Sequence, residues 1–243
     1  MVVPIYTVIG PNISMKFEGK EILMNAFFRL VLVSLALAVF SGCATSRGVI
    51  DVQEEVVANP ETGVALKFSR VTDVRRFEIN PRQADIPSLK NNEIDDPAIT
   101  SRAIARKRNG YGMALGDILL PDGSTVAGLV EGSLTKGLRE NGYRVLNVGD
   151  EGFEDAVPIE VDIEKFWGWF SPGFWSIGIN FETLLHLTGP AGPFVDGEEF
   201  DSKVERKFQT AGTGNWQTTI RASLDELNRD IAEDISNYKR SIQ

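Results

Sequence analysis

Residues 159–187 read IEVDIEKFWGWFSPGFWSIGINFETLLHL. In the first half, Ile159, Val161 and Ile163 alternate with acidic residues, which is the period-two pattern of a strand with one buried face. The turn-forming run Ser171-Pro172-Gly173 follows, and the alternation then resumes. The sequence therefore predicts a long β-hairpin with strands over 159–170 and 174–187.

Two amphipathic helices flank this hairpin. The first is predicted from Ser124 or Thr125, either of which can cap it, to the stop signal Asn141-Gly142. Its three interior glycines, at 128, 132 and 137, suggest that it approaches a sheet closely. The second is the C-terminal helix, whose apolar positions step by three or four residues: Ile220, Leu224, Leu227, Ile231, Ile235 and Tyr238.

Shorter strands are predicted over 64–71, 143–148 and 203–210, whereas the proline-rich residues 80–100 are predicted to be loop. This order of elements predicts an α+β fold. We expect a two-layer sandwich with a mostly antiparallel sheet and two helices on one face.

The N-terminal region carries a different signal. Arg29 is followed by the uncharged run Leu30–Phe40, whose eleven residues suit a signal peptide and are short for a membrane span. Phe40-Ser41-Gly42-Cys43 then resembles the bacterial lipobox, an apolar residue and two small residues before a cysteine. The alternatives are an uncleaved membrane anchor and a buried helix with an incidental thiol.

We therefore expect residues 1–42 to be a cleaved lipoprotein signal peptide, with 1–23 upstream of a true start at Met24. Residues 43–62 would be a lipidated tether and 63–243 a periplasmic α+β domain. No cofactor is expected beyond the diacylglyceryl and N-acyl lipid on Cys43, through which the protein would bind a lipid bilayer. The lipoprotein resemblance also implies a place at the periplasmic face of the outer membrane, because Ala44 and Thr45 follow the cysteine where Asp would retain the protein in the inner membrane.

Composition excludes several functions. The 243 residues carry a net charge of −9, so the chain gains nothing electrostatically by approaching nucleic acid or anionic head groups. One cysteine and one histidine, His186, leave no internal disulfide and no multi-histidine metal centre. No nucleophile elbow, P-loop or zinc-protease motif occurs, and Glu160, Asp162 and Glu164 read as a solvated strand face. We therefore expect no catalytic residues, no metal site and no enzyme.

Two clusters are candidate partner-binding sites. The first is aromatic and surrounds the predicted hairpin tip; besides Phe166 it contains Trp167, Trp169, Phe170, Phe174 and Trp175. At least two of these side chains are expected to be exposed, because neighbouring strand residues point to opposite faces; core packing is the alternative. The second cluster is the basic run Arg106, Lys107 and Arg108, which either meets an acidic partner or begins a solvated loop.

Several pieces of the chain together resemble the YajG-like outer-membrane lipoproteins. They are the lipobox at Cys43, the strand 64–71 followed by Asp73-Val74-Arg75, the helix-to-glycine segment 126–145 that ends in Arg139–Val145, the acidic strand 159–163 running on to Trp167 and Trp169, and the C-terminal helix. The resemblance implies an envelope lipoprotein with a small α/β domain and a protein partner in the envelope. We expect a non-enzymatic accessory or adaptor. The alternative is a lipid-handling auxiliary lipoprotein of a transport system, which a hydrophobic cavity behind Trp167 and Trp169 would favour.

Overall fold

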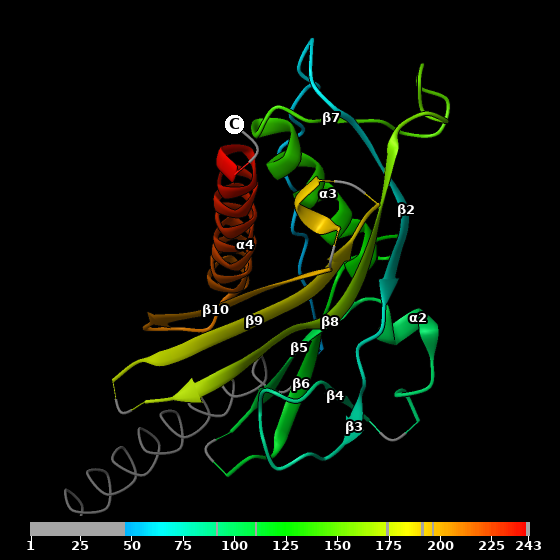
Figure 1. The fold of residues 1–243 in the computed structure, drawn as a ribbon. Coiled ribbons are helices and arrows are strands. Elements are labelled where there is room, and N and C mark those ends of the chain that lie inside the picture. Colours follow the sequence, from blue (N-terminus) through cyan, green and yellow to red (C-terminus); the bar gives the residue numbers. More distant parts are fainter. Residues whose placement is uncertain are drawn as a thin grey trace, which may run out of the picture. The chain divides into compact units, whose positions relative to one another are not determined.

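The computed structural model describes residues 47–241 except 91, 110, 174, 191 and 196. The predicted signal peptide and Cys43 lie outside these residues. The described chain forms an α+β domain with one large sheet, two long helices and a short one (Figure 1). No helix in this part of the chain is both long and apolar enough to span a membrane.

The predicted hairpin is the centre of the sheet. It comprises β8 (Val157–Pro172) and β9 (Ile177–Thr188), and β10 (Glu198–Phe208) adds to the far edge of β9. The other edge of β8 is shared by two strands. β2 (Ala65–Asp73) pairs with the first half of β8, and β5 (Ala103–Arg108) pairs with its second half.

The remaining strands add to the outer edges of β2 and β5. β7 (Arg144–Val145) lies beside β2, while β6 (Ala114–Leu119) pairs with β5 and carries β1 (Gly48–Val49) on its outer edge. The hairpins β5–β6 and β8–β9 and the β9–β10 ladder are antiparallel, but β2 and β5 run parallel to β8. The sheet is thus mixed, and the prediction of a mostly antiparallel sheet missed its parallel pairings.

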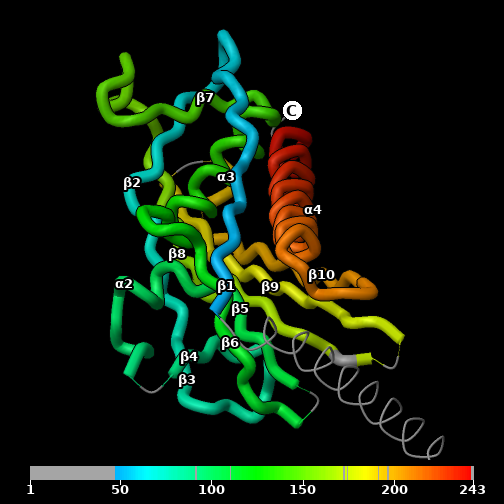
Figure 2. Tube along the Cα trace, turned by 180° about the vertical axis from the view of Figure 1, so that it is seen from behind, coloured from blue at the N-terminus to red at the C-terminus, as the bar shows by residue number. Residues whose placement is uncertain are grey.

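Both long helices cover one face of the sheet, as predicted (Figures 1 and 2). α3 (Val126–Glu140) begins at Thr125, whose hydroxyl accepts from the Gly128 amide at 3.1 Å. α4 (Thr213–Ser241) buries five of the six predicted apolar positions, Ile220, Leu224, Leu227, Ile231 and Ile235. Gly137 of α3 faces α4 rather than the sheet, because a Cβ there would lie 2.4 Å from the Asn228 side-chain oxygen.

The other face is partly covered by a segment that was predicted to be loop. It contains β3 (Glu78–Ile79), β4 (Ser88–Leu89) and the short helix α2 (Pro97–Thr100). Leu89 packs with Trp167 in a second apolar cluster, and Phe77 meets the Trp167 ring edge-on at 5.8 Å. We name the described residues of 77–100, all but 91, the flap.

The domain also begins earlier than the boundary expected at residue 63. Gly48 and Val49 pair with β6, and Ile50 and Val52 are buried in the main core. The part of the expected tether from Arg47 onward therefore packs against the domain, because Ile50 and Val52 join the main core and side chains of α3 and α4 donate to its carbonyls.

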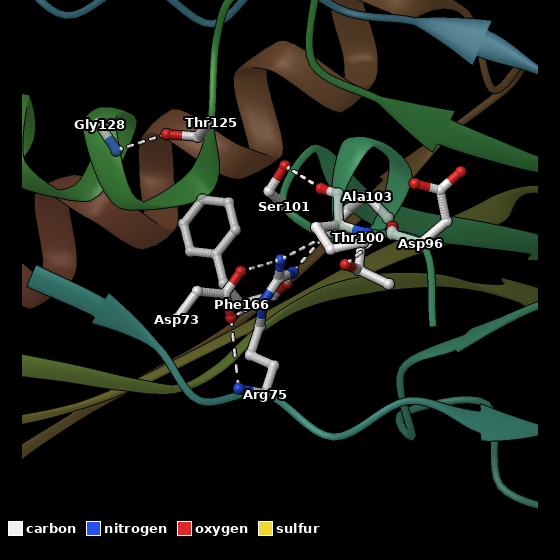
Figure 3. A network of polar contacts seen from close by, with 10 residues as sticks. Asp73, Arg75, Asp96, Thr100, Ser101, Ala103, Thr125, Gly128 and Phe166 are labelled. Atoms are coloured by element: carbon white, nitrogen blue, oxygen red, sulfur yellow. Dashed lines mark hydrogen bonds and ion pairs between the residues drawn. The ribbon is translucent and has the colours of Figure 1, made fainter. Parts of the chain in front are cut away.

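A buried arginine closes the gap between β2 and β5 along β8. The last β2 pairing joins Asp73 to Ile163, and the first β5 pairing joins Ala105 to Gly168. In between, Arg75 donates to the carbonyls of Phe166 at 2.9 Å, Ala103 at 2.6 Å and Thr100 at 2.9 Å (Figure 3). Its remaining donors bind both carboxylate oxygens of Asp73, each at 2.7 Å.

We predict that Arg75→Met lowers the free energy of unfolding by about 3–5 kcal/mol, because it leaves Asp73 and buried carbonyls without their donor. Urea unfolding of the purified domain measures the change. The exposed neighbour Arg76 provides the control, since Arg76→Met removes the same charge and is expected to leave stability almost unchanged. Equal effects of the two substitutions would show that the Arg75 network does not stabilise the sheet.

Candidate interaction surface at the hairpin end of the sheet

The predicted basic cluster lies on β5, in the sheet rather than in a loop. Arg106 faces Asp117 across the β5–β6 ladder, with Nε and Oδ1 3.4 Å apart, which is an ion pair without hydrogen-bond geometry. Asp117 is almost fully buried and also accepts from Arg47 at 3.0 Å, while Arg47 reaches Glu93 of the flap at 2.6 Å. Arg106 is therefore held inside the domain and is not presented to a partner.

Arg108 is also held inside the domain, by hydrogen bonds to uncharged groups. Its guanidinium donates to the Pro81 carbonyl at 2.9 Å and to the Ser88 hydroxyl at 2.8 Å, and so ties β5 to the flap. Burial, and secondarily the charge of Arg106, lowers the pKa of Arg108. Lys107 is half-buried, and burial lowers its pKa against the opposing effect of Asp117. The expectation of a solvated basic loop is thus corrected for Arg106, which pairs with Asp117, and for Arg108, which is buried and hydrogen-bonded to uncharged acceptors.

The aromatic cluster divides between core and surface. Phe166 and Trp167 are fully buried, so neither can form the exposed tip that the sequence suggested. Phe170 is half-buried. Its ring centre lies 5.1 Å from that of Trp216 in α4, and the two ring planes are tilted by 38°. Trp169 is half-buried on the open sheet face, where the Lys203 ammonium lies 5.9 Å from its ring centre.

Trp175 is the exposed aromatic of the β8–β9 turn, with 83% of its surface accessible. Phe174, its neighbour in the predicted cluster, lies outside the described residues. At least two exposed side chains were expected; among the described members Trp175 alone is strongly exposed.

A second exposed tip was missed by sequence reasoning. In the β5–β6 turn the Asn109 side chain accepts from the amides of Tyr111 and Met113, both at 3.0 Å. Gly112 takes the left-handed conformation, with φ +81°. This turn presents Tyr111 and Met113 to solvent, 94% and 63% exposed. The Asn-Gly-Tyr-Gly sequence is the signal that could have revealed it, since it is typical of a hairpin turn.

Both tips lie at the same end of the sheet. β5 runs parallel to β8, and Arg106 is level with Trp169. Asn109 and Pro172 each follow that level by three residues, and both hairpins project past the sheet at this end (Figures 1 and 2). We name the described parts of the two turns, 109–113 and 173–176, the hairpin end.

A groove of about 580 Å³ lies elsewhere, between residues 51–54 and the start of α3. Glu54 lines it, and the Oε1 atom of this side chain is buried without a hydrogen-bond partner. Burial raises the pKa of Glu54 above its ordinary value of 4.5, although Lys136 acts in the opposite direction. The charged form of this carboxyl is therefore disfavoured in the folded protein.

Comparison with known proteins assigns no family. No protein-family model matches the chain, and no curated protein matches it. Among solved structures, the chain is similar to an uncharacterized protein at 13% identity and TM-score 0.36, with 82% of this chain and 99% of that one covered. A Xanthomonas campestris protein of the family DUF330 matches at 12% identity and TM-score 0.42, covering 81% and 99%. A minor lipoprotein from Acinetobacter baumannii matches at 19% identity and TM-score 0.29, covering 45% and 84%.

With TM-scores below 0.5, these structures do not establish the fold or the function of this chain. The likeness to these three structures does not support the resemblance to the YajG-like family specifically.

We predict that Glu54→Gln raises the free energy of unfolding at about pH 7.5, because the wild-type folded state must hold a disfavoured charge there. This cost in folding free energy is lost as the pH falls through the raised pKa of Glu54 in the folded protein toward its lower pKa in the unfolded chain. The stability difference should therefore shrink toward zero by about pH 4. Urea unfolding at both pH values measures it, with the exposed Glu55→Gln as the matched control. A difference that is the same at both pH values would contradict burial as its cause.

Proposed function

We propose that this protein is a lipid-anchored envelope lipoprotein that acts as a non-enzymatic accessory or adaptor protein. The observation that carries the proposal is the lipobox-like Phe40–Cys43, which stands only four residues before Arg47. Arg47 already contacts Asp117 and Glu93, so the packed domain starts almost directly after the proposed anchor. A domain so close to its lipid would be held at the membrane surface.

The chemistry of the anchor follows from the cysteine. The thiol would take a diacylglyceryl group, and after cleavage the new amine of Cys43 could take a further acyl chain. Each buried methylene contributes about 0.8 kcal/mol, so several acyl chains together hold a protein to a bilayer permanently. We propose that the protein lies at the periplasmic face of the outer membrane, because Ala44 and Thr45 follow Cys43 where an Asp would retain a lipoprotein in the inner membrane.

The packing around Trp167 favours the adaptor over the lipid-handling alternative. A lipid carrier needs an apolar cavity. Trp167 is instead fully buried against Phe77, Leu89 and Leu119, and its indole nitrogen donates to the Ala84 carbonyl at 3.3 Å. The space around Trp167 is filled by the protein's own side chains, which supports the adaptor proposal.

A protein partner would meet the open sheet face that Trp169 and Lys203 share. Glu182 lies between Lys203 of β10 and Lys165 of β8 and pairs with both, and Lys165 also pairs with Asp85 of the flap. This face combines an aromatic ring with a row of alternating charges across three strands. An aromatic ring is the kind of side chain that is enriched in protein interfaces, and the row of charges would lie at the polar rim of such a contact.

We predict that Cys43→Ser abolishes incorporation of radiolabelled palmitate and releases the protein from sedimented membranes. Serine has no thiol to carry the diacylglyceryl group, whereas the rest of the chain is unchanged. Thr45→Ala serves as the control, because it alters the same segment and keeps the thiol. A Cys43→Ser protein that still takes up label and still sediments with membranes would refute the lipoprotein assignment.

A further inference from the structure

We propose that the hairpin end of the sheet rests on the bilayer surface, with Tyr111, Met113 and Trp175 in the headgroup region. This inference deepens the proposed function and rests on the lipid anchor at Cys43. The occupant of these exposed tips is then the membrane itself and not a second protein.

The direction of the chain supports this orientation. β1 runs parallel to β6, from the level of Ile118 toward Leu119, and therefore away from the hairpin end. Arg47, the residue directly before β1, therefore lies on the side of β1 that faces both tips. Arg47, which contacts Asp117, is level with Arg106 of β5.

The length of the chain agrees with its direction. Asn109 lies three residues beyond Arg106, so the β5–β6 tip extends about 10 Å past that level. Cys43 precedes Arg47 by four residues, which span at most about 14 Å when extended. A lipid on Cys43 can therefore lie in the same bilayer surface that the two tips touch. The short connection keeps the domain close to that surface.

The side chains at the tips have the chemistry of the membrane interface. Trp175 and Tyr111 each combine an apolar ring with a polar group, and such residues concentrate where the hydrocarbon meets the head groups. Met113 adds a flexible apolar side chain beside Tyr111. All three are strongly exposed, whereas most large hydrophobic side chains among the described residues are buried.

The charges near the tips are complementary to an anionic bilayer. In the strand rows beyond the level of Arg106 and Trp169, the ladders contain Lys107, Arg108, Arg206 and Lys207. Neither these rows nor the described residues of the hairpin end contain Asp or Glu, although the whole chain has 34 acidic residues. Glu205, level with Trp169, is the nearest acid along β10. Arg206 and Lys207 are exposed and lack the burial that constrains Arg108.

The test uses the full-length, lipidated protein in vesicles of phosphatidylethanolamine and phosphatidylglycerol doped with brominated phosphatidylcholine. Bromine quenches only tryptophans that touch the bilayer. Of the four tryptophans, Trp167 and Trp216 are buried and Trp169 is half-buried, so Trp175 is expected to supply most of the quenching. Trp175→Phe should lose that quenching, and Trp169→Phe should keep it. In the Trp175→Phe background, Tyr111→Trp should restore it.

Palmitate labelling of the same samples separates the two proposals. Protein without lipid on Cys43 would contradict the proposed function. Protein that is lipidated and vesicle-bound but unquenched would overturn the membrane contact alone and leave the tips to a protein partner. Quenching that survives Trp175→Phe unchanged would overturn it as well, because the contact would then lie elsewhere on the domain.

Discussion

The structure depends on the way Arg75 completes one edge of β8. Two strands, β2 and β5, share that edge end to end, and a strand junction of this kind would leave buried carbonyls without donors. Arg75 supplies the donors from a single side chain that has no exposed surface, and Asp73 balances its charge. Because the junction is closed in this way, β5 can continue beyond β2 with β6 beside it. The second hairpin, and with it the tip that carries Tyr111, follows from this arrangement.

The charges of this protein are unevenly distributed over its surface. The net charge of the chain therefore does not describe the charge near the hairpin end. A net charge of −9 argues against any approach to an anionic surface. Acids lie on α4, around the flap, along the first half of β8, in residues 150–155 and along β10 as far as Glu205, whereas the only charged residues in the rows next to the hairpin tips are basic. The local charge near the proposed membrane contact therefore has the opposite sign to the total, which is the quantity that composition reports.

The elements predicted well were those with a strong period. The alternation in 159–187 gave the central hairpin, and the spacing of Leu224, Leu227 and Ile231 gave α4. The strand β5 was missed because Arg106 and Arg108 read as solvent-facing in the sequence, and only the fold supplies their partners: Asp117, Ser88 and the Pro81 carbonyl. The prolines of residues 80–100 predict a loop, although apolar residues of the flap cover Trp167. The same long-range packing separates buried Trp167 from exposed Trp175, which no local pattern distinguishes.

Hydrogen–deuterium exchange tests the central claim, that an anchored domain stands on the membrane by its hairpin end. The lipidated protein on vesicles is compared with the Cys43→Ser protein in solution. We expect bilayer attachment to slow exchange in the segments 109–113 and 173–176 and to leave α4 and the first half of β10, residues 198–203, unchanged. Slowed exchange along α4 or residues 198–203, with both tips unaffected, would contradict the claim.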